Sequence, residues 1–447
     1  MKKLLIFLFF SILSGQWLET VICLPESGRS SLYELCWDSI DNKVYCYSCF
    51  ARQLFVIDGE TNELLKTMRL PHWPYSLIYN PIVNKVYCGI YENILVFDCR
   101  TDSLIKIIPF ADFYPDDMVL NTNHNKLYVM RTDIIITPSY VIDCYKDSII
   151  KTIPEVWIGA YDARSDRVYG ENCGGRLTIL DGKSDSVIKV VNERVATWTW
   201  TLNTRNNKYY CRAGEYPSAV KIFNAENDSL LRILWPGVGG VVNLAYNPVN
   251  NKIYVGGGED IEGYLTVPII DGETNTVDDY RYLLGRHGQV AVYYNSINNK
   301  LYCGGEYNLW VIDFVGEPMI REFEMPRCYG WTWNKKNNRF YISASNSSIY
   351  VFRDEIPGVE EVSPSLRIKE FEVSPTIGSS FNISWRGKEK EKVIVYNPSG
   401  RKVCEMELNP GKNLIWGGKD KKGNKLPPGI YFLKLERDRI TEKIILK

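Results

Sequence analysis

Residues 84–90 read Asn-Lys-Val-Tyr-Cys-Gly-Ile, and this short stretch decides the fold because its pattern recurs along the whole chain. Each copy has a polar turn residue, a basic residue, one further residue and a tyrosine. The basic residues of the eight copies are Lys43, Lys85, Lys126, Arg167, Lys208, Lys252, Lys300 and Arg339. A self-similar unit of about 40–48 residues indicates a repeat architecture in which each unit is one supersecondary element.

Each unit reads as four short strands, which we name a to d in chain order. In the second copy they are expected at residues 76–79, 85–90, 94–98 and 104–108, separated by Asn, Asp, Gly and Pro. No helical spacing of apolar residues lies between them, which excludes βαβ units. Four antiparallel strands in a unit of this length are typical of a β-propeller blade.

The last copy predicts how the ring closes. It has expected strands at residues 329–333, 340–343 and 349–352, but no fourth strand follows. Residues 18–25 (Leu-Glu-Thr-Val-Ile-Cys-Leu-Pro) look like the d strands at 103–109 and 148–154. The sequence therefore predicts an all-β, eight-bladed propeller in which the N-terminal strand completes the last blade and removes the exposed edges.

The units resemble the YVTN-type β-propeller repeat. The resemblance rests on residues 126–129 (Lys-Leu-Tyr-Val), 141–143 (Val-Ile-Asp) and the d strand at 148–154, and it covers roughly residues 18–354. It implies the propeller fold and says little about function, because one fold hosts many functions.

The first residues predict export. Met1-Lys2-Lys3, an apolar run over residues 4–13 and Ser14-Gly15 form the pattern of a signal peptide, with cleavage near Gly15. A buried strand or an uncleaved anchor is the alternative, and a lipoprotein site at Cys23 lacks the small residues that such processing needs. No later segment is long and apolar enough to cross a membrane. We expect a signal peptide at 1–15, a propeller at 16–355, a linker at 356–364 and a C-terminal domain at 365–447.

The C-terminal domain predicts an Ig-like β-sandwich. Strands are expected at residues 367–373, 381–385, 392–397, 402–408, 413–416, 429–435 and 441–446. Residues 396–403 (Tyr-Asn-Pro-Ser-Gly-Arg-Lys-Val), 413–420 (Asn-Leu-Ile-Trp-Gly-Gly-Lys-Asp) and 426–432 (Leu-Pro-Pro-Gly-Ile-Tyr-Phe) resemble the C-terminal sorting domain of bacterial type IX secretion substrates and the related module of the flagellar hook-capping (FlgD) family. Gly417-Gly418 stands where that family has Asp-Gly. The resemblance implies a secretion-machinery partner and an extracellular or cell-surface location; a plain Ig-like adhesion module is the alternative.

The amino-acid composition gives little indication of a chemical activity. Lys+Arg and Asp+Glu both number 53, so no general attraction to nucleic acid is expected. The twelve cysteines include four that directly follow the repeat tyrosine, as in Cys46 and Cys88, which indicates small buried positions rather than a disulfide framework. The lone pair Cys46 and Cys49 is a weak metal or redox signal. We expect no catalytic residue, metal or cofactor.

Two weak chemical signals remain open. Asp116 and Asp117 are the acidic pair expected near the channel, without a visible partner for acid–base catalysis. Glu259, Asp260 and Glu262 follow three glycines and could hold Ca²⁺, although a solvated loop is the simpler interpretation. The three histidines do not converge on one site.

The expected binding face is the one formed by the d–a loops, which connect successive blades. Aromatic and acidic residues gather there and at the starts of the a strands: Trp73, Tyr75, Tyr114, Asp116, Asp117, Trp157, Trp198, Tyr329 and Trp331. They suit a glycan, peptide or protein ligand, but rings that only fill the spaces between blades would give the same pattern. We therefore expect a non-catalytic binding or scaffold protein. The alternative is a lyase or lactonase-like hydrolase acting at the channel mouth.

Overall fold

The turn before each repeat's basic residue explains why the pattern recurs. In the computed structural model, Asn or Asp at this position always has a positive φ, between 49° and 57°. Asn and Asp tolerate the left-handed region better than other residues with a Cβ. The members are Asn42, Asn84, Asn125, Asp166, Asn207, Asn251, Asn299 and Asn338. Each one reverses the chain from strand a into strand b.

The structure describes residues 16–24, 32–131, 138–214, 218–283, 288–314, 319–354, 371–374, 377–385, 390–397, 401–410, 412–435 and 441–446. The expected signal peptide and linker, and His287, lie outside these residues. The chain folds as two compact units, residues 1–359 and 360–447. Among the described residues all regular structure is β, and no helix is long and apolar enough to span a bilayer.

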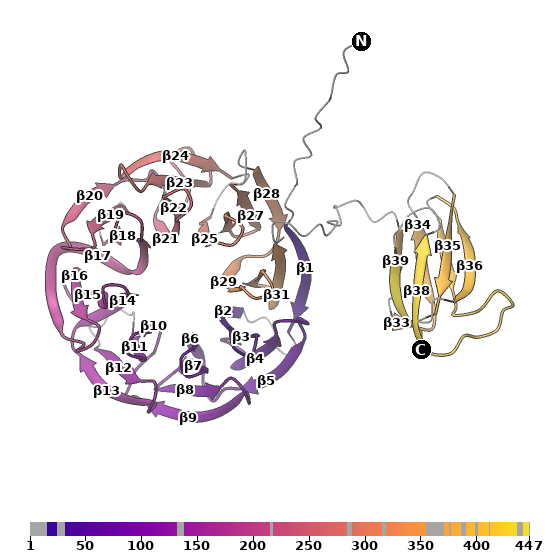
Figure 1. Ribbon diagram of the computed structural model, residues 1–447, viewed down its shortest axis with the longest axis horizontal. Helices are drawn as coiled ribbons and strands as arrows, with labels where there is room; N and C mark the ends of the chain where they lie inside the picture. The colour runs from indigo at the N-terminus through magenta and orange to yellow at the C-terminus, as the bar shows by residue number, and fades with distance from the viewer. Residues whose placement is uncertain are drawn as a thin grey trace, which may run out of the picture. The chain divides into compact units, whose positions relative to one another are not determined.

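The first unit is a ring of antiparallel sheets (Figure 1). Blades 1 to 3 consist of β2 (Leu32–Asp38), β3 (Lys43–Ser48), β4 (Gln53–Asp58) and β5 (Leu64–Arg69); β6 (Pro74–Asn80), β7 (Lys85–Ile90), β8 (Asn93–Asp98) and β9 (Ser103–Pro109); and β10 (Asp117–Asn121), β11 (Lys126–Met130), β12 (Ser139–Asp143) and β13 (Ser148–Ile153). The expected strands of the second copy therefore match β6 to β9 to within one or two residues at each end.

Blades 4 and 5 share one strand. They consist of β14 (Val156–Asp162), β15 (Arg167–Asn172), β16 (Arg176–Asp181), β17 (Val187–Asn203), β18 (Lys208–Ala213), β19 (Val220–Asn224) and β20 (Leu230–Leu234), hydrogen-bonded in that order. The 17-residue β17 is strand d of blade 4 and then strand a of blade 5, with a register shift between Ala196 and Trp200. The sequence predicted two strands and a loop here.

Blades 6 and 7 return to the simple pattern. They consist of β21 (Val241–Asn247), β22 (Lys252–Gly257), β23 (Thr266–Asp271) and β24 (Thr276–Tyr282), and of β25 (Ala291–Asn295), β26 (Lys300–Gly304), β27 (Asn308–Asp313) and β28 (Met319–Glu324). Aliphatic and small side chains of the b and c strands are buried in cores between neighbouring blades.

The N-terminal strand completes the last sheet. β1 (Gln16–Cys23) pairs antiparallel with β31 (Ser348–Asp354), which pairs with β30 (Arg339–Ala344), and β30 pairs in turn with β29 (Cys328–Asn334). Glu19 on β1 accepts two hydrogen bonds from the Arg339 guanidinium, at 2.6 and 2.7 Å. The described residues thus form eight four-stranded sheets if β17 is counted in two of them.

The repeat's basic residue and tyrosine join each blade to the next, in a contact that we call the inter-blade clamp. Lys43 and Tyr45 of blade 1 both bind the carboxylate of Asp102 in the c–d turn of blade 2, at 2.8 and 2.5 Å. Equivalent clamps end on Asp147, Asp185, Asn275, Asp354 and, from blade 8, Asn62. In the clamp on Asp228 only the basic residue Arg167 takes part, because the Tyr169 hydroxyl is buried without a hydrogen-bond partner among the described residues. Lys252 differs, because it pairs with Asp271 and Asp278 of its own blade.

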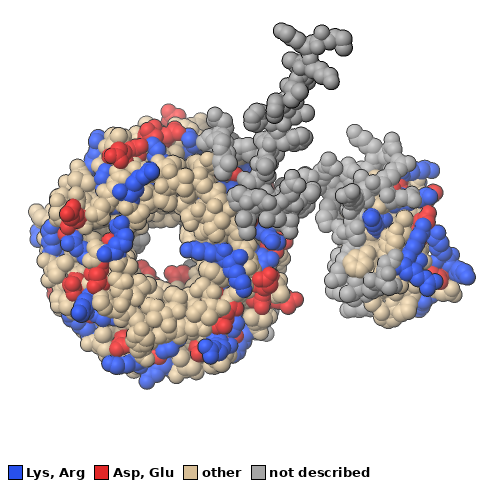
Figure 2. All heavy atoms as spheres, viewed as in Figure 1, with Lys and Arg blue, Asp and Glu red and all other residues tan. Residues whose placement is uncertain are grey.

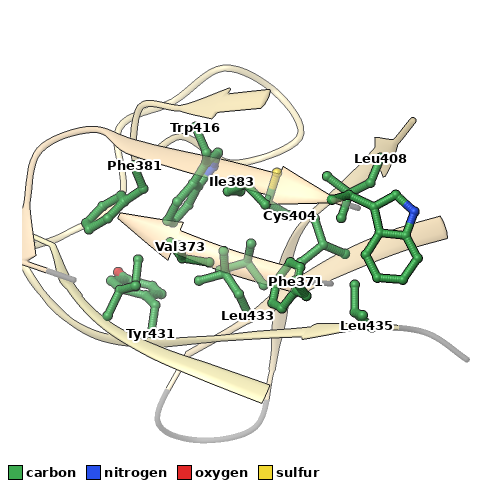
Figure 3. Packing of buried hydrophobic residues seen from close by; sticks show 14 of the residues in the cluster. Phe371, Val373, Phe381, Ile383, Cys404, Leu408, Trp416, Tyr431, Leu433 and Leu435 are labelled. Atoms are coloured by element: carbon green, nitrogen blue, oxygen red, sulfur yellow. The ribbon is translucent and has the colours of Figure 1, made fainter. Parts of the chain in front are cut away.

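The second unit has two sheets around a separate core. One contains β32 (Phe371–Ser374), β34 (Phe381–Trp385) and β37 (Asn413–Trp416); the other contains β33 (Ile377–Gly378), β39 (Thr441–Leu446), β38 (Gly429–Leu435), β35 (Glu391–Tyr396) and β36 (Lys402–Leu408). Figure 3 shows Phe371, Trp416 and Leu433 among the buried side chains. Gly418 has φ 64°, and a Cβ there would lie 2.5 Å from Leu446, so this turn needs a glycine.

Candidate functional site at the channel mouth

A small pocket lies where the inner strands of four neighbouring blades begin. It has a volume of about 240 Å³ and lies between β29, β2, β6 and β10. Its lining residues are Glu34, Leu35, Ser76, Leu77, Asp117, Met118, Tyr329, Gly330 and Trp331. An open channel passes through the centre of the ring (Figure 2). Because strand a of each blade faces the channel and begins after the d–a loop, the pocket lies at the mouth on the d–a side.

Glu34 is the pocket's most strongly perturbed acid. Side chains alternate along a strand, and its neighbour Leu35 is buried in the core between blades 8 and 1, so Glu34 faces the channel. One Glu34 oxygen accepts the backbone N–H of Leu77 at 2.8 Å. Burial, together with the charge of Asp117, raises the pKa of Glu34 to about 8. At neutral pH this carboxyl is mostly protonated.

Asp117 is the second acid of the pocket. It is the first residue of β10, and the preceding loop is held to blade 2 by a 2.5 Å hydrogen bond from the Ser76 hydroxyl to the Pro115 carbonyl. Burial and the charge of Asp116 raise the pKa of Asp117 to about 6, against the opposing effect of the Met118 N–H. Two carboxyls with raised pKa values therefore face one pocket.

Aromatic rings form another wall of the pocket. Trp331 packs against the core between blades 7 and 8 and stacks on Tyr293, with 6.2 Å between ring centroids. Tyr329 is about one-third exposed, and the guanidinium of Arg327 lies 5.6 Å from its ring centroid. Trp331 thus both fills space between blades and lines the pocket.

A connected series of rings, which we call the aromatic row, lies on the d–a side of blades 2 and 3. Successive ring centroids are 6.0 Å apart from Trp73 to His72, 5.0 Å from His72 to Tyr91, 4.7 Å from Tyr91 to Tyr114 and 5.5 Å from Tyr114 to Tyr75. Trp73 is 47% exposed. The guanidinium of Arg131 lies 4.5 Å from the centroid of the Tyr114 ring, within cation–π range.

The structure sorts the residues of the expected site into two groups. Trp73, Tyr75 and Tyr114 belong to the aromatic row, and Asp117, Tyr329 and Trp331 line the pocket. Asp116 adjoins Asp117 in the loop before β10 and donates its backbone N–H to the Tyr114 and Met130 carbonyls.

Two expected loop residues lie in strands instead. Trp157 is the second residue of β14, because only two residues separate β13 from β14 and Glu155 makes the turn with φ 56°. Its indole N–H is buried without a hydrogen-bond partner, and it belongs to neither group. Trp198 lies within the continuous β17, and its side chain is outside the described residues. The expectation that Trp157 lies in a d–a loop was wrong, whereas Trp198, expected where a d–a loop meets an a strand, lies in a strand.

Sequence reasoning missed Glu34, His72 and Tyr91 as members of these groups. Glu34 immediately precedes the apolar part of the first a strand, and alternation with buried Leu35 was the available signal. It supplies Asp117 with the partner that the sequence did not reveal. Tyr91 lies in a b–c turn, which shares a face with the d–a loops because the strands are antiparallel.

Metal and thiol chemistry gain no support within the described part of the chain. No group of three or more His, Cys, Asp or Glu side chains there is arranged to hold a metal ion, including the Ca²⁺ alternative at Glu259, Asp260 and Glu262. Asp260 instead accepts the backbone N–H groups of Glu262 and Tyr264. All twelve cysteines are free, and burial raises the pKa of Cys46 and Cys88, so those thiols stay protonated.

Solved structures with the same ring architecture identify the fold. The computationally designed Ika8 protein aligns with a TM-score of 0.56 and 15% identity over 76% of this chain and 100% of its own. The chain has a β-propeller fold. The Dos1 propeller aligns with a TM-score of 0.58 and 11% identity, over 73% of this chain and 94% of its own. BamB from Moraxella catarrhalis aligns with a TM-score of 0.58 and 11% identity, over 76% of this chain and 100% of its own. No known family profile matches the chain, and a search of curated proteins finds no match.

Proposed function

We propose that this β-propeller is a secreted or cell-surface binding protein, without catalytic activity, whose d–a face binds a carbohydrate or a peptide. The aromatic row carries the proposal. Its rings lie in contact one after another, from the exposed indole of Trp73 to Tyr75, which adjoins the pocket residue Ser76 in the chain.

Aromatic rings suit this role physically. Each offers a flat apolar surface with few side-chain torsions to restrict on binding. Polar groups flank the row: Arg131 stacks on Tyr114, and the Tyr91 hydroxyl lies 3.4 Å from the Asp112 carboxylate. Rings bordered by charged groups fit a ligand with both apolar faces and hydrogen-bonding groups, as sugars and peptides have.

The ends of the chain supply the proposed route. Residues 1–15 direct export as a signal peptide. The C-terminal domain is Ig-like and directs type IX-like secretion, as the resemblance over residues 365–447 implies. The two-sheet arrangement of β32 to β39 supports an Ig-like sandwich. The repeats are proposed to be of the YVTN type, in an eight-bladed ring closed by β1.

The Glu34–Asp117 pair favours a second candidate, a lyase or hydrolase acting at the channel mouth. Two carboxyls whose pKa values lie near 8 and 6 can serve as general acid and general base at neutral pH. Within the described residues the pocket offers neither a metal site nor a basic side chain to stabilise a developing oxyanion. Binding therefore remains the first proposal.

A glycan and peptide array probed with the full chain tests the proposal. We expect specific hits that Tyr114→Ala or Trp73→Ala weakens at least tenfold, since stacking contacts of aromatic rings contribute about 1–3 kcal/mol. Tyr145→Ala is the matched control, because Tyr145 is 68% exposed in a c–d turn, on the opposite face. Hits that are insensitive to both row variants, or no hits, would refute binding on this face.

A further inference from the structure

We propose that the pocket between β29, β2, β6 and β10 binds a primary alkylammonium group, the side chain of a lysine in a peptide ligand, and releases a proton as it does so. This inference rests on the proposed binding function and names the chemistry of one subsite within it. It selects a peptide from the two ligand classes proposed above.

Charge is the first argument. Glu34 and Asp117 both line the pocket, and none of its other lining residues is charged. In the described part of the chain neither carboxyl forms an ion pair with a lysine, arginine or histidine. Their hydrogen bonds come from backbone N–H groups, Leu77 to Glu34 and Met118 to Asp117. Acids that are buried without a cation are strained by desolvation, and a cationic ligand relieves that strain.

Shape and lining are the second argument, independent of the acids. Tyr329 and Trp331 line the pocket beside the two acids, and their ring carbons offer the methylene stem of a lysine an apolar contact. A volume of about 240 Å³ is below the roughly 300–1,000 Å³ of a pocket for a whole small ligand, so it fits one side chain.

A divalent metal ion fits the pocket less well. Ca²⁺ takes six to eight oxygen ligands, whereas carboxyl oxygens here come from two residues, and no third acid or imidazole completes a site among the described residues. Ammonium needs only a few acceptors in a loose arrangement. A lysine side chain is therefore the occupant that matches both the acids and the aromatic residues of the pocket.

Proton release follows from the state of the empty pocket. Glu34 has a pKa of about 8, and the ammonium favours its ionised form, so Glu34 loses a proton when the ligand binds near neutral pH. The groups that face Glu34 are Asp117 on β10, Cys36 on β2, Cys46 and Tyr47 on β3, and Cys88 on β7. Burial raises the pKa of the three thiols and of the Tyr47 hydroxyl, so among these groups only Glu34 and Asp117 change charge between pH 6 and 8.5.

The test is a titration of the full chain with Nα-acetyl-lysine methylamide to 100 mM, followed by tryptophan fluorescence because Trp331 lines the pocket. Nα-acetyl-norleucine methylamide is the matched neutral probe, and sodium chloride matches the ionic strength. We expect saturable binding of the lysine probe at pH 8.5, at least tenfold tighter than that of norleucine. Between pH 8 and 6 the affinity should fall by up to about tenfold per pH unit. Calorimetry in two buffers should show close to one proton released near pH 7.

Three variants sharpen the test. Asp117→Asn should weaken lysine binding at least tenfold, and Glu34→Gln should remove most of the pH dependence and the proton release. Glu155→Gln is the control for a charge on the same face outside the pocket and the aromatic row: Glu155 is exposed in the turn before β14, and binding should change less than twofold. Circular dichroism confirms that each variant is folded.

The outcomes separate this inference from the proposed function. No lysine-over-norleucine preference up to 100 mM, or equal binding by Asp117→Asn, overturns the ammonium site. Glucosamine binding in place of lysine would show that the pocket takes an amino sugar and would overturn the peptide assignment. Array hits that depend on Tyr114 but lack lysine would retain the binding function and reject only this inference.

Discussion

Replacing Lys300 with methionine should remove the ion at the centre of the most buried inter-blade clamp. The Lys300 and Asp354 side chains are 0% and 1% exposed, and the ammonium lies 2.6 Å from the carboxylate. Tyr302 and Asn295 donate hydrogen bonds to the other Asp354 oxygen, both at 2.9 Å. The substitution keeps the methylene stem but removes the ammonium that lies 2.6 Å from the Asp354 carboxylate and 3.8 Å from that of Asp313.

The expected cost follows from that geometry. Replacing one partner of a buried ion pair lowers the free energy of unfolding by about 3–5 kcal/mol, because the remaining charge stays desolvated. Two neutral donors still hold Asp354, so we expect the lower end, about 3 kcal/mol. The exposed pair Lys146–Asp143, 3.5 Å apart with Lys146 75% exposed, should contribute only about 0–1 kcal/mol.

Urea unfolding followed by tryptophan fluorescence measures the effect as a change in midpoint at constant slope. Lys146→Met is the matched control. In the double variant Lys300→Met/Asp354→Asn the loss should be smaller than the sum of the single losses, because the carboxylate charge that Lys300 compensates is removed as well. A cost below about 1 kcal/mol for Lys300→Met, equal to that of Lys146→Met, would refute the view that clamps hold the blades together.

Three further predictions concern the ring and the channel mouth. Deleting residues 1–31 removes β1 and the Glu19–Arg339 pair, and we expect a large loss of thermal stability; an unchanged melting temperature would contradict closure by this strand. The raised pKa of Glu34 means that the folded state holds its proton more tightly than the unfolded state, so stability falls as pH rises from 4.5 to 8. Glu34→Gln should flatten that fall and raise the free energy of unfolding by about 1–2 kcal/mol at pH 8.5. This gain is smaller than the full shift would give at roughly 1.4 kcal/mol per pKa unit, because the pocket opens to solvent. If the reasoning fails, the urea midpoints of the variant and the parent will not differ at pH 5 or at pH 8.5. Gly89→Ala places a Cβ 2.6 Å from the Pro115 carbonyl, so it should displace the loop that carries Asp117 and weaken ligand binding, whereas unchanged stability and binding would show that the loop adapts freely.

The ring was predictable from sequence because its determinants are local and repeated. Asn or Asp at a left-handed turn, a basic residue and a tyrosine recur in one order, and each has a separate physical reason to be there. Closure by β1 was also predictable, since a missing d strand at one end matched a spare strand at the other. The role of the clamp was not, because its two halves lie 57 residues apart in Tyr45 and Asp102.

The candidate site was predictable only in part. Aromatic residues at the d–a face were visible as composition, but which rings touch depends on blade twist and loop conformation. Glu34 escaped notice because a single acid beside an apolar strand looks like an ordinary surface residue; only the ring brings it opposite Asp117, from a position 83 residues earlier. The continuous β17 escaped notice because residues 192–194 (Asn-Glu-Arg) read as a loop, while the hydrogen bonds of both neighbouring sheets keep them extended.

The direction of the inter-blade clamp bears on how such a chain can lengthen. Most units carry a donor half, the basic residue and tyrosine of the second strand, and an acceptor half, an Asp or Asn at or after the end of the third strand. Lys252 of blade 6, which pairs within its own blade, is the exception. A tandem copy of a unit that has both halves would fit neighbours that carry the matching halves. Duplication of such a unit therefore preserves its junctions, and the junction from blade 8 to blade 1 uses the same kind of contact, from Tyr341 to Asn62. Copying of such units at the gene level can thus extend a ring of this kind, and selection then adjusts its diameter and the residues at its channel mouths.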